Sequence, residues 1–122
     1  MIVSDRVYKL AKRLAKKSNH GRYRLGCVIF KHNEILGLGY NLLRTDPRSP
    51  DPFSFIHAEY HSTFGVDPSD LLGAAAFVYM ERVKSGTVGI GKPCKHCHRL
   101  LTELGLKRVY YTDNKEIKFV DL

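Results

Sequence analysis

The chain has 122 residues, of which 43% are hydrophobic and 26% charged, a balance typical of one folded domain with its own core. Its formal net charge of +8 and pI of about 9.5 suit a polyanionic partner or a phosphorylated small substrate. No segment has the apolar length of a signal peptide or a membrane span, so we expect a cytoplasmic protein with no membrane partner. Three cysteines, two of them three residues apart, indicate metal or redox chemistry in a reducing compartment.

An amphipathic helix is expected at the start of the chain, where Ser4 can serve as the N-cap. Apolar residues recur there at steps of three and four, which is the spacing of one helix face. These residues are Val7, Leu10, Ala11, Leu14 and Ala15. The opposite face is basic and carries Arg6, Lys9, Lys12, Arg13, Lys16 and Lys17.

Two apolar runs, residues 25–31 and 34–40, flank the polar pair His32-Asn33, and this pattern predicts a β-hairpin. Cys27 lies within the first run, among strand residues, and is expected in the core. Residues 44–55 contain three prolines and predict a loop.

The second half of the chain alternates helices and strands. A helix over about residues 56–65, ending at Gly65, precedes a turn around Asp67-Pro68-Ser69 and a buried strand over residues 74–83. Another helix is expected from Pro93 to Leu104, with Pro93 in its first turn and Gly105 as its C-terminal cap. Residues 107–112 and 116–122 read as two further strands.

The resulting order, α-β-β-α-β-α-β-β, predicts an α/β layer fold in which helices cover a mixed sheet. Only Asp113, Asn114 and Lys115 separate the last two strands. A parallel connection needs about a dozen residues or more, so these strands pair antiparallel if they are neighbours.

Two short motifs carry the chemistry of a catalytic zinc site. His57 and Glu59 lie near the start of one predicted helix, and Cys94 and Cys97 lie near the start of another. A catalytic zinc takes three protein ligands and keeps one position open, and His57, Cys94 and Cys97 supply those three ligands. Glu59 is then free to move protons between a water molecule and a leaving amine.

His57-Ala58-Glu59 together with Pro93-Cys94-x-x-Cys97 resembles the signature of the cytidine deaminase-like superfamily. Gly39-Tyr40-Asn41 is similar to the substrate-binding Gly-x-Asn of that family. The resemblance implies a single zinc-dependent deaminase domain over residues 1–122, with a three-layer α-β-α fold and a five-stranded mixed sheet. It further implies that Asn41 contacts the base or the sugar, and that the Ala58 backbone N–H meets the base carbonyl.

Other readings of the cysteine pair remain open. Cys94-x-x-Cys97-His98 also matches the attachment motif of c-type haem, and a C-x-x-C pair occurs in thioredoxin-like redox proteins. A structural zinc would need a fourth protein ligand, for which His61, His96 and His98 are candidates. Covalent haem attachment requires export, for which the sequence shows no signal peptide, and the redox reading leaves His57-Ala58-Glu59 unexplained.

The substrate is expected to be cytosine in a free nucleoside or nucleoside monophosphate, namely cytidine, deoxycytidine, CMP or dCMP. The antiparallel terminal hairpin resembles the branch of the superfamily that contains free-nucleoside cytidine deaminases. The alternative is cytosine, or less readily adenine, in single-stranded nucleic acid, which the basic helix favours and to which four aromatic residues could contribute stacking: Tyr40, Phe53, Phe55 and Tyr60. A non-catalytic scaffold stabilised by zinc is the third hypothesis, and a homo-oligomer stays open.

Overall fold

The computed structural model describes residues 3–42 and 56–122, and the predicted proline-rich loop at 44–55, with Phe53 and Phe55, lies outside this part. Five strands form one sheet, in the order β2-β1-β3-β4-β5. The strands are β1 (Tyr23–Lys31), β2 (Glu34–Tyr40), β3 (Ala75–Arg82), β4 (Arg108–Asp113) and β5 (Glu116–Asp121). The helices are α1 (Asp5–Ala15), α2 (Ala58–His61), α3 (Pro68–Leu71) and α4 (Lys95–Glu103).

The sheet is mixed, as the sequence predicts. β1 pairs antiparallel with β2 and β3, while β3 and β4 run parallel and are connected through α4. The last two strands pair antiparallel across a tight turn in which Asn114 has a φ of 55°. The first hairpin turns at His32 and Asn33, and His32 has a φ of 57°.

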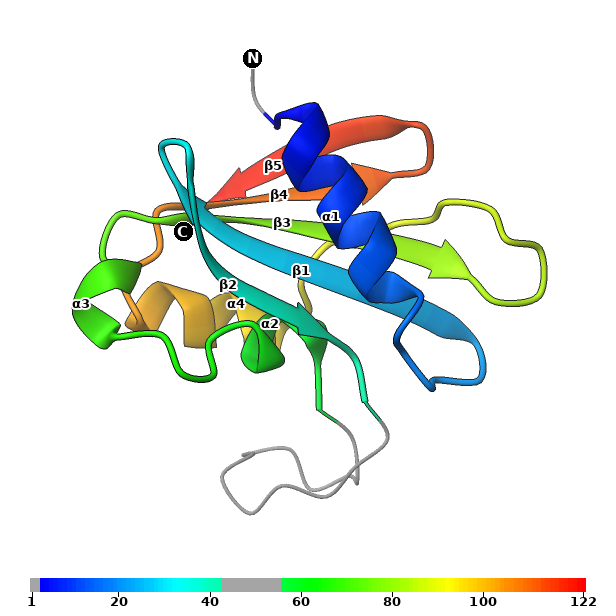
Figure 1. The fold of residues 1–122 in the computed structure, drawn as a ribbon, viewed down its shortest axis with the longest axis horizontal. Coiled ribbons are helices and arrows are strands. Elements are labelled where there is room, and N and C mark those ends of the chain that lie inside the picture. Colours follow the sequence, from blue (N-terminus) through cyan, green and yellow to red (C-terminus); the bar gives the residue numbers. More distant parts are fainter. Residues whose placement is uncertain (1–2, 43–55) are drawn as a thin grey trace.

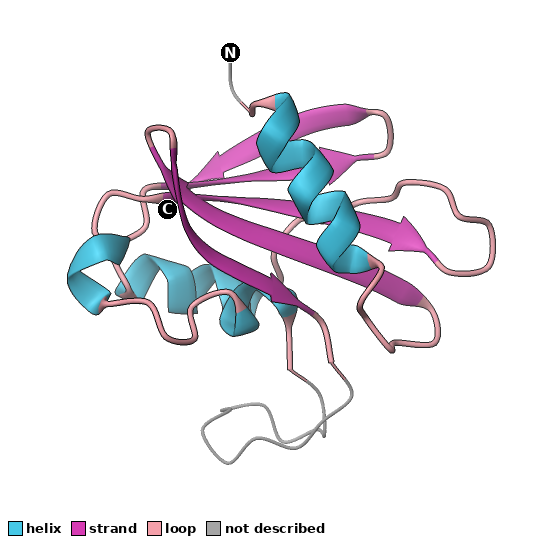
Figure 2. Cartoon of the chain, in the orientation of Figure 1, coloured by secondary structure: helices cyan, strands magenta, loops and turns pink. Residues whose placement is uncertain are grey.

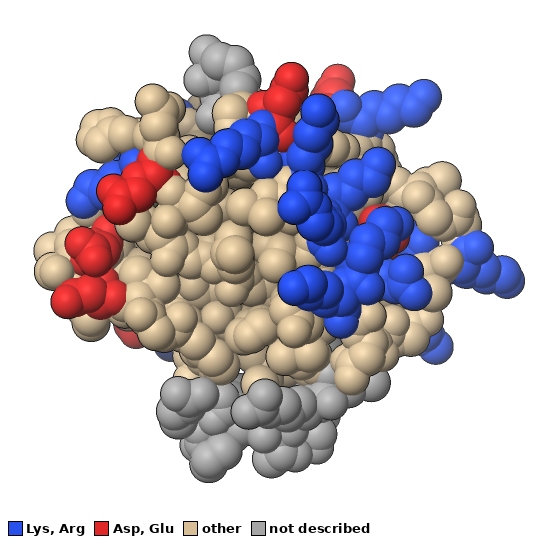
Figure 3. All heavy atoms as spheres, in the orientation of Figure 1, with Lys and Arg blue, Asp and Glu red and all other residues tan. Residues whose placement is uncertain are grey.

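Helix α1 covers one face of the sheet (Figures 1 and 2). It begins as expected, because the Ser4 hydroxyl accepts a hydrogen bond from the Val7 N–H at 3.2 Å. Its apolar side is buried against Val28, Phe77 and Tyr79. The outer side is exposed, and Figure 3 shows lysine and arginine side chains gathered along it.

Helices α2 and α4 cover the opposite face, so the chain forms the expected three layers (Figure 1). Cys27 is fully buried in this second core, as predicted. The backbone of α2 lies very close to β2, because Gly37 and Gly39 present no side chains there. A Cβ at Gly39 would be 2.3 Å from the Ser62 nitrogen and 2.5 Å from the Ala58 oxygen.

The second helix is much shorter than the predicted 56–65 segment. Ile56 forms an antiparallel bridge with Leu42, and α2 begins only after His57. Beyond His61, the hydroxyls of Ser62 and Thr63 donate to carbonyl oxygens three residues earlier, at 2.6 and 2.7 Å. These side chains take up the last carbonyls of the helix, so the chain continues in turns.

Two further boundaries differ from the sequence prediction. The expected turn at Asp67-Pro68-Ser69 is the start of α3, because the Asp67 carboxylate accepts a hydrogen bond from the Ser69 N–H at 2.9 Å. Pro93 lies outside α4, since Cys94 is the N-cap. The other end of α4 is as predicted: Gly105 has a φ of 90°, and the Leu106 N–H bonds back to the Leu101 oxygen.

None of the helices in the described part of the chain is both long and apolar enough to cross a membrane.

Candidate metal centre and active site

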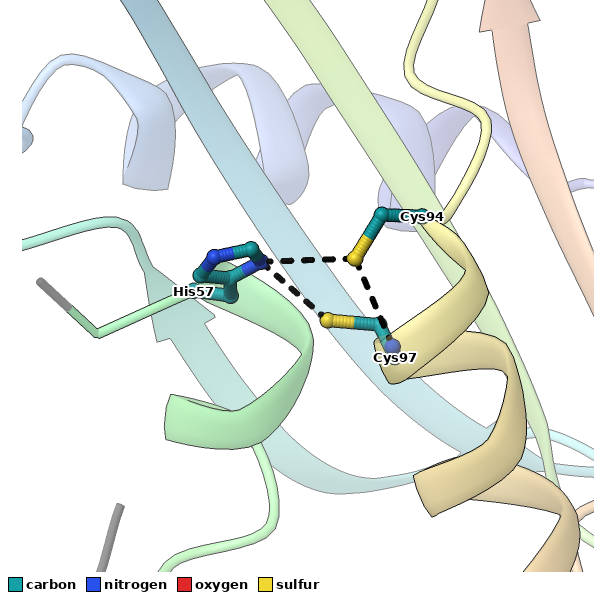
Figure 4. A group of neighbouring side chains, drawn as sticks. All are labelled: His57, Cys94 and Cys97. Carbon is teal, nitrogen blue, oxygen red and sulfur yellow. Dashed lines mark hydrogen bonds between the residues drawn. The ribbon is translucent and has the colours of Figure 1, made fainter. Parts of the chain in front are cut away.

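Three side chains from two helix starts converge into one cluster (Figure 4). His57 is the N-cap of α2, Cys94 is the N-cap of α4, and Cys97 lies in the first turn of α4. The Nδ1 atom of His57 faces both sulfur atoms, at 3.8 Å from Cys94 Sγ and 3.3 Å from Cys97 Sγ. These three ligand atoms all lie within 4.8 Å of one another.

The cluster fits a zinc ion. Tetrahedral zinc with ordinary Zn–N and Zn–S bonds would separate a nitrogen ligand from a sulfur ligand by about 3.6 Å. The two N···S distances, 3.8 and 3.3 Å, lie on either side of that value. One imidazole and two thiolates also form a donor set that zinc prefers, and three ligands leave the fourth position open.

The surroundings of the cysteines would favour a cation. The Cys97 N–H donates to Cys94 Sγ at 3.4 Å, so the start of α4 offers a backbone donor to a thiolate there. Burial raises the pKa of the Cys97 thiol, and the charge of Glu59 raises it further. A bound divalent cation reverses this effect, because thiolates coordinate it directly.

A pocket of about 220 Å³ opens beside the cluster. It borders two of the three cluster residues, His57 and Cys94, so an open coordination position would be reachable from it. The other residues that line it are His20, Tyr23, Leu25, Asn41, Ala58, Glu59 and Lys92. The residues with a predicted role in the site, Cys97 excepted, therefore border this space: Asn41, His57, Ala58, Glu59 and Cys94.

Glu59 projects from α2 toward the metal cluster and is only 3% exposed. Its carboxyl lines the pocket and is near enough to the Cys97 thiol for each group to shift the pKa of the other. Burial raises the pKa of this carboxyl, while a backbone hydrogen bond, His57 and Cys97 lower it by smaller amounts. A carboxyl whose pKa is raised toward neutrality can both accept and donate a proton.

Asn41 and Ala58 form part of the pocket wall. The Asn41 side chain is buried and bridges the backbone of β1: Oδ1 accepts from the Leu25 N–H and Nδ2 donates to the Tyr23 oxygen, both at 2.9 Å. These two bonds fix the orientation of the amide, which keeps one lone pair and one N–H for a further partner. Ala58 is fully buried at the first position of α2.

The three other histidines considered as a fourth ligand lie outside the cluster. The Nδ1 atom of His61 is 3.0 Å from the Tyr40 N–H, and the His61 ring packs edge-on against the Tyr40 ring. Tyr40 and Tyr60, considered for base stacking, are not among the pocket residues, and Tyr60 packs edge-on against Phe64.

Sequence reasoning missed three polar pocket residues: His20, Tyr23 and Lys92. The Nδ1 atom of His20 accepts hydrogen bonds from the N–H groups of Arg22 and Tyr23, each at 3.0 Å. Nothing in the sequence around His20 predicts this. Lys92 directly precedes the Pro93-Cys94 motif, and that position was a usable signal.

Residues 1–113 match the family model described as the cytidine and deoxycytidylate deaminase zinc-binding region. The chain therefore belongs to this zinc-binding deaminase family. A comparison with curated protein sequences gave no match.

Several solved structures share the fold. The dCMP deaminase of cyanophage S-TIM5 is 22% identical, with a TM-score of 0.64 over 92% of this chain and 83% of that one. Cytidine deaminase from Burkholderia pseudomallei is 19% identical, with a TM-score of 0.67 over 98% of this chain and 93% of that one. Cytidine deaminase from Mycobacterium tuberculosis is 15% identical, with a TM-score of 0.58 over 95% and 90% of the two chains. At these identities the likeness establishes the cytidine deaminase fold.

Proposed function

We propose that this chain hydrolytically deaminates cytosine to uracil in a free nucleoside or nucleoside monophosphate, with zinc as its cofactor. The observation that carries the proposal is the position of Glu59. Its buried carboxyl lies beside the His57-Cys94-Cys97 cluster and lines the same pocket. A metal cluster, a proton carrier and a cavity of small-molecule size therefore occur together.

The reaction replaces the exocyclic amine of cytosine with the oxygen of water and releases ammonia. Zinc held by His57, Cys94 and Cys97 would supply the acidity that makes a water molecule nucleophilic at neutral pH. Glu59 accepts the proton that this water loses and passes it to the departing amine. Both transfers use the same carboxyl, so its raised pKa suits the cycle.

The remaining pocket residues orient the substrate. Asn41 is held by two hydrogen bonds to β1. The remaining N–H and the remaining lone pair of its amide therefore offer a donor and an acceptor in fixed positions to the base or the sugar. The Ala58 N–H lies at the first turn of α2, where backbone donors lack partners within the helix, and it is the candidate partner of the base carbonyl.

The size of the pocket supports a small substrate. Its volume of about 220 Å³ lies below the roughly 300–1,000 Å³ of pockets for drug-sized ligands. Helix α1, with its basic outer side, covers the opposite face of the sheet from α2 and α4 (Figures 1 and 3). The cations of α1 are thus on another layer of the fold than the candidate active site.

Cytosine in single-stranded nucleic acid is the second candidate substrate, and the exposed cations of α1 are the observation in its favour. A strand that entered the pocket would have to pass around the sheet to reach these cations.

The decisive experiment is a parallel assay of the zinc-loaded protein on a panel of cytosine compounds. The panel contains cytidine, deoxycytidine, CMP, dCMP, free cytosine and a cytosine-bearing single strand. We expect ammonia release and uracil formation from a nucleoside or a monophosphate, and loss of both after zinc removal. Conversion of the strand alone would favour the second candidate, and conversion of none of these compounds would favour a zinc-stabilised scaffold.

A further inference from the structure

One cation at the pocket has no partner among the described residues. Lys92 is exposed and lines the cavity beside Cys94. Its side chain makes no ion pair or hydrogen bond with any residue in the described part of the chain. Among the described residues that line this pocket, Glu59 is the only acidic one, and it is buried. The exposed part of the pocket therefore carries a positive charge that no anion in the described part of the chain neutralises.

The backbone holds Lys92 in place from both sides. Before it, the Gly91 N–H donates to the Thr112 oxygen at 2.8 Å, and Ile90 forms an antiparallel bridge with Asp113 at the end of β4. A Cβ at Gly91 would lie 2.8 Å from the Val78 oxygen, so a side chain there would push this segment off the sheet. After it, Pro93 and the metal-binding Cys94 restrict the chain. The lysine is thus attached to a fixed segment two residues from the metal cluster.

Another part of the pocket wall is formed at the start of β1, by His20 and Tyr23. The Nδ1 atom of His20 accepts two backbone hydrogen bonds, so the proton of the neutral ring is on Nε2. The ring also stacks against Tyr23, with centroids 5.9 Å apart, and both residues line the pocket. The His20 and Tyr23 rings therefore form a wall of the same pocket that Lys92 lines.

The chemistry of the proposed reaction decides which part of a substrate reaches Lys92. The amine-bearing carbon of cytosine must face the metal cluster and the buried Glu59. The sugar, and any phosphate attached to it, must then point toward the exposed part of the pocket. A phosphate needs cationic and N–H donors there, and a plain nucleoside has no group that uses a lysine charge.

We infer that Lys92 forms a phosphate subsite and that the substrate is a pyrimidine nucleoside monophosphate rather than a free nucleoside. This inference rests on the proposed deaminase function and narrows it. Hydrogen bonds to a charged partner contribute enough to change affinity by about 10- to 100-fold. The inference therefore predicts a selectivity of that size and assigns most of it to one side chain.

The test compares Lys92→Gln with Lys95→Gln, which removes the same charge on the other side of Cys94 from an exposed residue outside the pocket. Both variants and the wild type are assayed on deoxycytidine and dCMP, and on cytidine and CMP. We expect Lys92→Gln to lower kcat/KM for the monophosphates about 10- to 100-fold and to change that for the nucleosides by less than about threefold. Lys95→Gln should leave both classes within about threefold of the wild type.

Binding of the products separates this inference from the proposed function. Calorimetry measures the affinity of dUMP and deoxyuridine for the zinc-loaded wild type and for Lys92→Gln, without any turnover. Tighter binding of dUMP that depends on Lys92 supports the phosphate subsite. Equal losses for nucleosides and monophosphates, or no loss in Lys92→Gln, would overturn the subsite while deamination itself stands. A wild type that neither converts nor binds any of these compounds would overturn the deaminase proposal and the subsite together.

Discussion

Two glutamates of this chain are almost equally buried but occupy opposite faces of the sheet. Glu59 is 3% exposed and Glu81 is 2% exposed. Glu59 lies on the α2 and α4 side, beside a pocket and the three side chains that fit a zinc ion. Glu81 lies under α1, where the Lys16 ammonium contacts its carboxylate at 2.8 Å and Arg24 stands opposite on β1.

The difference shows that burial alone does not mark a catalytic carboxylate. Glu81 is paired with the Lys16 ammonium, and it is not among the residues that line the pocket beside the metal cluster. The pairing through its Oε2 atom fixes α1 to the sheet. Glu59 has a cavity beside it and a raised pKa, so its proton can be exchanged with a substrate. The four predictions below test this contrast between the two faces.

The largest effect is expected from loss of a metal ligand. Cys97→Ser should remove most of the bound zinc and reduce deamination below detection, because two ligands hold zinc far less well than three. Elemental analysis of the purified protein measures the zinc content. Cys27→Ala is the control, since Cys27 is buried on the same face but outside the cluster, and it should keep about one zinc per chain. Full zinc occupancy in Cys97→Ser would refute the ligand assignment.

The next effect contrasts the two glutamates directly. Glu59→Gln should keep its zinc and lower kcat by about two to four orders of magnitude, because a buried amide cannot carry the proton. Glu81→Gln should leave kcat within a few-fold of the wild type and lower the melting temperature instead. Lys16 is 53% exposed, so we expect its pairing with Glu81 to contribute only about 1 kcal/mol to the free energy of unfolding. Similar losses of kcat in the two variants would remove the functional distinction between the faces.

Much of this contrast could be predicted from the sequence. The zinc ligands and Glu59 belong to short motifs that the sequence places near two helix starts. The structure has both motifs at helix starts, although α2 and α4 each begin two residues later than predicted. The order of elements and the antiparallel end of the sheet follow from hydrophobic periodicity and from connection length. These features depend on residues close in sequence, where patterns of spacing are informative.

Features that depend on distant residues could not be predicted. Lys16 was assigned to a solvated basic face, but its partner Glu81 is 65 positions away. His20 became a pocket residue because two backbone N–H groups hold its ring. The predicted length of α2 was wrong. The side-chain hydroxyls of Ser62 and Thr63 bond to backbone carbonyl oxygens that a longer helix would use. In each case a specific hydrogen bond favours one conformation, and the sequence pattern alone does not distinguish that conformation from its alternatives.

A third, smaller effect is expected from two glycines that allow helices to approach the sheet. A Cβ at Gly39 would clash with the α2 backbone, and a Cβ at Gly26 would lie 2.0 Å from the Ala11 oxygen of α1. Each alanine variant should lose about 1–3 kcal/mol of stability through overpacking. Gly39→Ala should also lower kcat at least tenfold per folded molecule, since α2 carries His57 and Glu59 at its start. Thermal unfolding and active-protein assays measure the two effects, and equal kcat values for both variants would contradict the separation of the faces.

The smallest effect is expected from the basic side of α1. Because Lys16 binds Glu81, a variant that tests surface charge alone should change Lys9, Lys12 and Arg13 to Gln and leave Lys16 in place. These three side chains are exposed on the face opposite the pocket, so turnover of the small substrate should stay within about twofold of the wild type.

If a single strand followed this surface, the logarithm of its affinity would fall with the logarithm of the salt concentration, with a slope of about 0.7 per phosphate contact. The triple variant would then reduce that slope by about 2. We expect weak strand binding at physiological salt and no measurable change of slope. Tight, salt-dependent binding that the triple variant weakens, combined with cytosine conversion in the bound strand, would show that the α1 face takes part in substrate recognition and that the two faces act together.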